Sequence, residues 1–138
     1  MDAKHNSLAR SRLQSAGLVK VQFVGDELRF AFRGNIEQRA RKVRDFVDSI
    51  FENLRCSGDT TRLKGVVLCG EVIWRRFHDC DFFDGTCAVS CSDWLSSVRE
   101  NQVVINDAFK KELTRDGIAT SSFASIASVG DTGYLLRS

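Results

Sequence analysis

Two segments in the first third of the chain place an apolar side chain at every second position. They are LVKVQFV over residues 18–24 and ELRFAF over residues 27–32. Alternation with a period of two is typical of β-strands with one buried face. Only Gly25 and Asp26 separate the segments, and a two-residue link with glycine first suits a type II′ turn. The pattern therefore predicts a β-hairpin.

A helical pattern follows the hairpin. Apolar residues recur at spacings of three and four over residues 35–55, at Ile36, Ala40, Val43, Val47, Ile50 and Leu54. This spacing predicts an amphipathic helix, with Asn35 as its N-cap and Gln38 three residues further on. Before the hairpin, residues 5–16 are predicted to be the end of another helix, which Gly17 closes as a C-cap.

Strands and helices alternate in the second half of the chain. Residues 63–74, LKGVVLCGEVIW, are nearly all apolar and are interrupted by Gly70, which predicts a buried central strand. The patterns further on predict a helix from about residue 85, a strand over 102–106, a short helix from Asp107 and a closing strand pair around 130–132. The order (α)ββαβαβαββ predicts an α/β (α+β) sandwich, with helices on one face of a mostly antiparallel sheet.

Composition narrows the class of protein without assigning a function. The 138 residues are 43% apolar and 28% charged, which is ordinary for one globular domain spanning 1–138. A net charge of +2 gives no electrostatic argument for nucleic acid or for an anionic membrane. The sequence has neither an apolar run of roughly 18 residues nor a secretory signal at its start. We therefore expect a soluble, cytoplasmic protein that binds no nucleic acid and no membrane.

The cysteines form no common metal-binding pattern. There are five, at Cys56, Cys69, Cys80, Cys87 and Cys91, and no two of them are spaced as CxxC. A zinc site that includes His78 near Cys80 is an alternative, but its spacing matches no usual zinc motif. The sequence favours reduced and mostly buried thiols.

Four short motifs, which follow one another from Leu18 to the C-terminus, carry a resemblance to a known family. They are KVQFVGD at 20–26, GVVLCGEV at 65–72, DFFDGTCAVSCS at 81–92 and VVINDAFKKEL at 103–113. Their order and spacing resemble those of the catalytic domain of the class III nucleotidyl cyclases, the adenylate and guanylate cyclases. The resemblance implies a ferredoxin-like, nucleotidyl-cyclase-like fold.

The resemblance also implies a chemistry and a set of site residues. Such cyclases join the 3′-hydroxyl of a nucleoside triphosphate to its α-phosphate and release pyrophosphate, using two divalent ions held by aspartates at a dimer interface. Asp26 matches the second metal-binding Asp, so Mg²⁺ or Mn²⁺ is the implied metal. Gln22 and Asp81 match the two positions that sense the base. A homodimer or a cyclase partner chain is the implied partner.

The chain departs from the family pattern at several positions. Ala88 and Ser92 occupy the positions where the family has an Asn and an Arg that stabilise the transition state. The family's first strand, with its F-x-D metal motif, is expected upstream of the predicted helix that ends near Gly17, and the sequence lacks it. Gln22 replaces the family's Lys or Glu, and an amide both donates and accepts, so it can read a base edge.

Three interpretations follow from these departures. The first is a degenerate cyclase-like domain, a regulatory module that binds nucleotide or metal or that dimerises. The alternative is an active nucleotide cyclase whose first strand and missing catalytic groups come from an upstream segment or a partner chain. The third is an unrelated ferredoxin-like domain that carries the motifs by chance. For Asp26 itself, the plain alternative is a turn residue without a metal.

Overall fold

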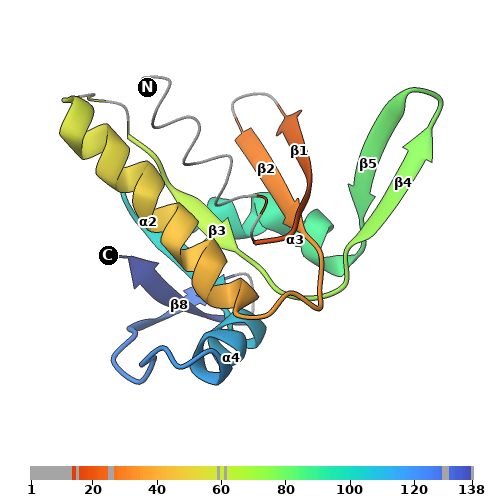
Figure 1. The fold of residues 1–138 in the computed structure, drawn as a ribbon. Coiled ribbons are helices and arrows are strands. Elements are labelled where there is room, and N and C mark those ends of the chain that lie inside the picture. Colours follow the sequence, from red (N-terminus) through yellow and green to blue (C-terminus); the bar gives the residue numbers. More distant parts are fainter. Residues whose placement is uncertain are drawn as a thin grey trace. The chain divides into compact units, whose positions relative to one another are not determined.

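The computed structural model describes residues 14, 16–24, 27–58, 60, 62–128 and 131–137. The chain divides into two compact units, 1–61 and 62–138 (Figure 1). The expectation of a single domain over 1–138 stays a prediction. No helix among the described residues is both long enough and apolar enough to cross a membrane.

The first unit contains the predicted hairpin and the helix after it. Strands β1 (Leu18–Val24) and β2 (Glu27–Phe32) pair in an antiparallel manner. Helix α2 spans Arg39–Ser57. The ring of Phe30 in β2 meets the ring of Phe46 in α2 edge to face, with the ring centroids 5.2 Å apart. This aromatic contact packs the helix on the hairpin, and it confirms the prediction of a hairpin followed by an amphipathic helix.

The start of α2 differs from the prediction. Gln38, rather than Asn35, is the N-cap, and no side chain caps the helix. Both residues have left-handed backbones, with φ of 57° at Asn35 and 59° at Gln38, so the chain turns twice before the helix begins at Arg39. At the other end, Gly58 closes α2 with φ of 69°. Gly17, with φ of 86°, has the left-handed backbone expected of a helix C-cap.

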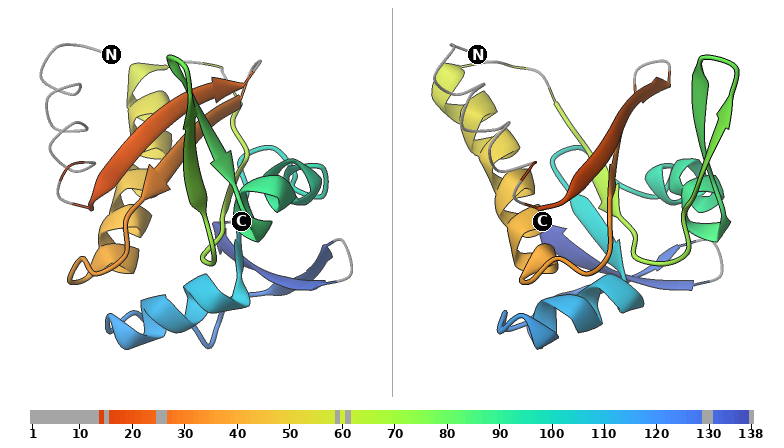
Figure 2. Two further views of the ribbon diagram at one scale, coloured as in Figure 1. Left: turned by 90° about the vertical axis from the view of Figure 1, so that its right-hand side faces the viewer. Right: turned by 45° about the vertical axis from the view of Figure 1, so that its right-hand side comes forward.

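The second unit contains a four-stranded sheet, a separate hairpin and two helices (Figures 1 and 2). The sheet has the order β3 (Gly65–Val67), β6 (Val103–Asn106), β8 (Asp131–Arg137), β7 (Ser125–Ser128). The hairpin comprises β4 (Ile73–Phe77) and β5 (Cys80–Asp84), and the helices are α3 (Thr86–Leu95) and α4 (Asp107–Arg115). Within the sheet, β3 and β6 are parallel and the other neighbours are antiparallel. The structure therefore has the expected α/β class.

The segment 63–74 does not form the long central strand that its apolar character predicts. Only Gly65–Val67 pair with β6, at one end of the described sheet, and the chain then leaves the sheet before β4 begins at Ile73. The side chain of Asn106 bonds both the N–H and the carbonyl oxygen of Cys69. The backbone of Cys69 therefore finds its partners outside a strand ladder, and the strand ends early.

The core of the second unit is built around Trp94 of α3. Its indole packs with Val98 and with Val104 of β6, and four half-buried residues surround this cluster: Val66, Leu68, Ile126 and Leu135. Gly133 of β8 lies directly beneath it, since an added Cβ would be 2.7 Å from Cζ3 of Trp94 and 2.8 Å from Cγ1 of Val104. The sheet therefore accommodates the tryptophan because residue 133 has no side chain.

We expect Gly133→Ala to lower the free energy of unfolding by about 1–3 kcal/mol, because the new methyl group overpacks a filled core. Gly34→Ala is the matched control, since its Cβ would find only the Arg39 guanidinium, at an ordinary 3.6 Å. We expect this control to change stability by less than about 0.5 kcal/mol. Urea denaturation measures both variants. Equal midpoints for Gly133→Ala and the unsubstituted protein would contradict the packing described.

Candidate functional site

The predicted base-sensing residues lie on the two hairpins. Gln22 is in β1, paired with Arg29 of β2. Asp81 is in β5, paired with Arg76 of β4. The structure describes the backbones but not the side chains of Gln22 and Asp81. Asp26, the predicted metal ligand, lies outside the described residues. Gln22 belongs to the first unit and Asp81 to the second, and the base-sensing role of each stays a prediction.

The described residues include no ready-made metal centre. No three His, Cys, Asp or Glu side chains among them are grouped closely enough to hold a metal ion. The thiols of Cys69 and Cys91 are half-buried, while the thiol of Cys56 is exposed. The expectation of mostly buried thiols is therefore wrong for Cys56, which lies near the end of α2 rather than on its buried face.

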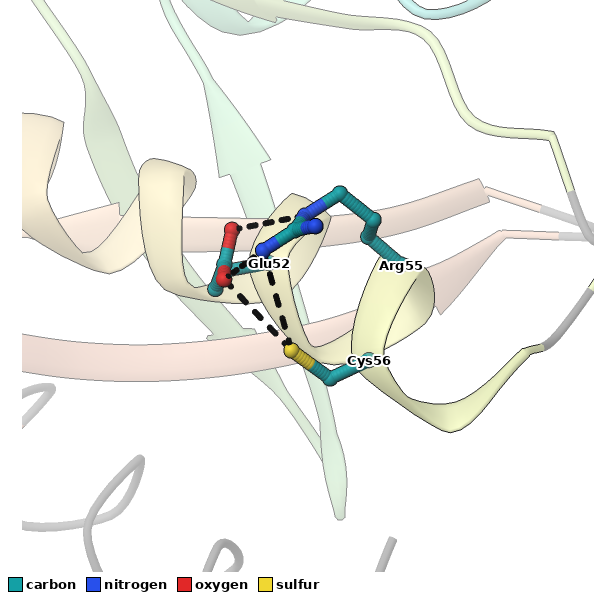
Figure 3. A network of polar contacts seen from close by, with 3 residues as sticks. All are labelled: Glu52, Arg55 and Cys56. Atoms are coloured by element: carbon teal, nitrogen blue, oxygen red, sulfur yellow. Dashed lines mark hydrogen bonds and ion pairs between the residues drawn. The ribbon is translucent and has the colours of Figure 1, made fainter.

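Cys56 belongs to an exposed polar network at the C-terminal end of α2 (Figure 3). Oε1 of Glu52 accepts a hydrogen bond from Nη2 of Arg55 at 2.5 Å, and it lies 3.4 Å from Sγ of Cys56. The hydrogen bond that Arg55 donates to Glu52, together with the negative charge of Glu52, raises the pKa of the Arg55 guanidinium. A raised pKa favours the folded state at neutral pH and loses its effect only in strong alkali. The network is solvent-exposed, so it adds little to stability.

The junction between β5 and α3 depends on Gly85. This residue has φ of 94° and ψ of 167°, a conformation essentially restricted to glycine. An added Cβ would lie 2.8 Å from the carbonyl oxygen of Glu71 and 3.4 Å from the nitrogen of Ile73. The loop between β3 and β4 therefore packs its backbone directly on the junction that follows Asp81.

The same loop is held from its other side by Asn106. Oδ1 of Asn106 accepts hydrogen bonds from the N–H of Cys69 and from the N–H of Phe109, each at 3.1 Å. Nδ2 donates to the carbonyl oxygen of Cys69 at 2.9 Å. One half-buried side chain therefore caps α4 and anchors the loop that begins at the end of β3.

Sequence reasoning predicted the helix start at Asp107 but missed the role of the residue before it. Asn is a favoured N-cap. The position of Asn106 between an apolar strand and a helix was therefore a signal that it caps α4. The contact with Cys69, 37 residues away, had no signal in a single sequence. It depends on how β3 pairs with β6.

The positions where the resemblance expects Asn and Arg both lie on α3. Ala88 is in the first turns of this helix, and Ser92 is exposed one turn further along. Neither residue type provides an amide or a guanidinium. The chain itself therefore supplies no such groups at these two positions.

Substitution of Gly85 tests how tightly the loop packs on the junction. Gly58 provides a matched control, because its φ of 69° is also positive but an added Cβ there meets nothing within 4 Å. Gly58→Ala should cost about 1–2 kcal/mol from backbone strain alone. Gly85→Ala should cost at least about 1 kcal/mol more, because its ψ of 167° is also unfavourable for alanine and its Cβ overlaps the Glu71 carbonyl. Chemical denaturation measures both costs, and equal costs would contradict the close approach.

The structure is similar to solved guanylyl cyclase domains. It matches the monomeric crystal structure of a double mutant of the guanylyl cyclase domain of the RhoGC fusion protein, from the aquatic fungus Blastocladiella emersonii. The match has a TM-score of 0.66 and 14% sequence identity, and it covers 96% of this chain and 76% of that one. It matches the guanylate cyclase domain of RhGC from Catenaria anguillulae, in complex with GTP, with a TM-score of 0.62 and 16% identity, over 96% of this chain and 79% of that one.

Another monomeric structure of the Blastocladiella emersonii domain gives a TM-score of 0.61 at 16% identity, over 98% of this chain and 79% of that one. No protein-family model matches the sequence, and no curated protein matches it. At these identities the likeness is one of fold. The chain has the fold of guanylyl cyclase catalytic domains, the class III nucleotidyl cyclase fold, as its motifs predicted.

Proposed function

We propose that this chain is a degenerate cyclase-like domain that binds a nucleoside triphosphate together with Mg²⁺ or Mn²⁺ and acts as a regulatory module. The observation that carries the proposal is a contrast. Its fold matches, over 96% of the chain, a guanylate cyclase domain in complex with GTP, yet Ala88 and Ser92 stand where the resemblance expects two catalytic groups. A shared fold does not by itself transfer the chemistry.

The residues that contact the base are Gln22 and Asp81, which the resemblance matches to the two base-sensing positions. The amide of Gln22 can hydrogen-bond the edge of a base, and the carboxylate of Asp81 can accept from a donor on a base. An amide donates as well as accepts, so Gln22 tolerates more than one base. The proposed ligand is therefore a nucleoside triphosphate, and ATP and GTP are the two candidates.

The chain would hold the implied metal ion only together with the nucleotide, because the phosphates have to supply most of the ligands. Mg²⁺ is usually held by one or two carboxylates plus substrate phosphates, and it keeps several waters. The described residues contain no group of three possible ligands. Asp26 is the carboxylate that would hold the ion, and the triphosphate would supply the remaining oxygens. When bound, the ion neutralises phosphate charge.

Slow turnover follows from the residues on α3. The side chains of alanine and serine provide no positive charge for the charge that develops at the phosphates. Removing one preorganised donor of this kind costs about 10²–10³ in kcat. The loss of both family groups leaves a domain that binds its nucleotide but converts it only very slowly. Such a domain is suited to sensing a nucleotide or to supporting a partner.

The module acts through association, with a second copy or with a cyclase partner chain. Association is supported by the two missing catalytic groups, because another chain would have to contribute them to any reaction. Two of the similar structures are monomeric guanylyl cyclase domains, so this fold is also found without a partner. The active alternative is a cyclase that converts a nucleoside triphosphate to a 3′,5′-cyclic nucleotide once a partner or an upstream segment completes it.

Asp26→Ala tests the metal ligand. We expect this variant to lose at least about tenfold in metal-dependent affinity for a fluorescent nucleoside triphosphate, equivalent to about 1.4 kcal/mol. Asp45→Ala is the matched control, because Asp45 is an exposed carboxylate on α2 that pairs with Arg44. It should bind like the unsubstituted protein. Equal affinities for both variants would contradict the role of Asp26.

A product assay separates the module from the active enzyme. The protein is incubated with each of the four nucleoside triphosphates and Mn²⁺, and cyclic products are sought by mass spectrometry. We expect no more product than the Asp26→Ala variant forms, because the groups that stabilise the transition state are absent. A cyclic nucleotide that forms with Asp45→Ala but not with Asp26→Ala would establish the active alternative instead.

A further inference from the structure

The side chain of Asn106 joins three parts of the second unit. It ends β6, it caps α4 through the N–H of Phe109, and it bonds both polar backbone groups of Cys69. The parallel pairing of β3 with β6 ends at Val67 and Ile105. Beyond the end of the ladder, the Asn106 amide supplies Cys69 with a donor and an acceptor, because a carboxamide presents the same groups as a peptide.

Only asparagine suits all three hydrogen-bond partners at position 106. The two backbone N–H groups require an oxygen, and the Cys69 carbonyl requires a donor, so the orientation of the amide is fixed. Aspartate keeps the oxygen and loses the donor. Serine caps a helix, but its single hydroxyl cannot replace three bonds. Glutamine has the right group on a longer stem that does not suit an N-cap.

A short chain of backbone contacts leads from Asn106 to the segment that carries Asp81. Cys69 opens the loop to β4, and two residues later the carbonyl of Glu71 packs on Gly85. Gly85 follows β5 directly and precedes α3. Figure 1 shows this path, in which β3 leads through the loop into β4 and β5 returns to α3. A change in the loop therefore acts on the end of β5 and on the start of α3.

We propose that Asn106 is a positioning residue for nucleotide recognition, which fixes the loop Leu68–Val72 against Gly85 and thereby sets the backbone that presents Asp81 to the base. The inference rests on the proposed function for its ligand. Its structural part, the coupling of Asn106 to the β5–α3 junction, stands on the hydrogen bonds and on the close approach at Gly85.

The test compares Asn106→Asp with Thr120→Val in the full chain. Aspartate preserves the cap of α4, so the helix stays formed, while the bond to the Cys69 carbonyl is lost and a carboxylate faces that oxygen. Thr120→Val removes the 2.7 Å hydrogen bond between Thr120 and Thr114. Thr120 lies beyond the opposite end of α4, so this variant weakens the same helix without touching the loop.

Hydrogen exchange gives the first readout and needs no nucleotide. We expect Asn106→Asp to speed amide exchange at least about fivefold in residues 69–72 and at the Gly85 junction, and to leave exchange within α4 unchanged. Thr120→Val should speed exchange within α4 and leave exchange in residues 69–72 and at Gly85 unchanged. Unchanged exchange at Gly85 in Asn106→Asp would overturn the coupling, whatever the protein binds.

Nucleotide affinity gives the second readout. We expect Asn106→Asp to change the ratio of the dissociation constants for ATP and GTP, because Asp81 is no longer presented to the base in the same way, while Thr120→Val keeps the ratio of the unsubstituted protein. A merely structural role would weaken both nucleotides equally, and that result would overturn the positioning role. If the unsubstituted protein binds neither nucleotide, the proposed function fails and the positioning role fails with it, while the exchange data still decide the coupling.

Discussion

The three hydrogen bonds of the Asn106 side chain are the constraint on which the second unit most depends. Two of them satisfy the backbone of Cys69 where the β3 ladder stops, and the third caps α4. A half-buried peptide group without partners would cost about 1–3 kcal/mol. This side chain therefore allows the chain to leave the sheet after Val67. The chain then packs the backbone of Glu71 on Gly85 and goes on to form the β4–β5 hairpin.

Local patterns in the sequence predicted the elements whose structure depends on near neighbours. The period-two segments became β1 and β2, and the residues after Asn106 became α4. The failures occurred where tertiary contacts decide. Residues 63–74 looked like one buried strand, but Asn106 ends that strand after Val67. Asn35 looked like an N-cap, but two left-handed residues delay the helix to Arg39.

The functional residues were predictable to a different degree. Motif order alone indicated the cyclase fold, which the solved guanylyl cyclase domains bear out. The roles of Gln22, Asp26 and Asp81 remain predictions, because a role depends on what the side chains meet and not on their order along the chain. Ala88 and Ser92 are informative in another way. The absence of an amide and of a guanidinium is readable from the sequence, since neither alanine nor serine contains such a group.

The central proposal is that the protein retains a nucleoside triphosphate that it does not efficiently convert. The most direct test is to equilibrate the protein with ATP or GTP and Mg²⁺, separate the protein from free nucleotide, and identify what stays bound by mass spectrometry. We expect to recover an intact triphosphate bound to the protein, and we expect it to be lost when a chelator removes the metal. Recovery of a cyclic nucleotide, or of no nucleotide at all, would contradict the proposal.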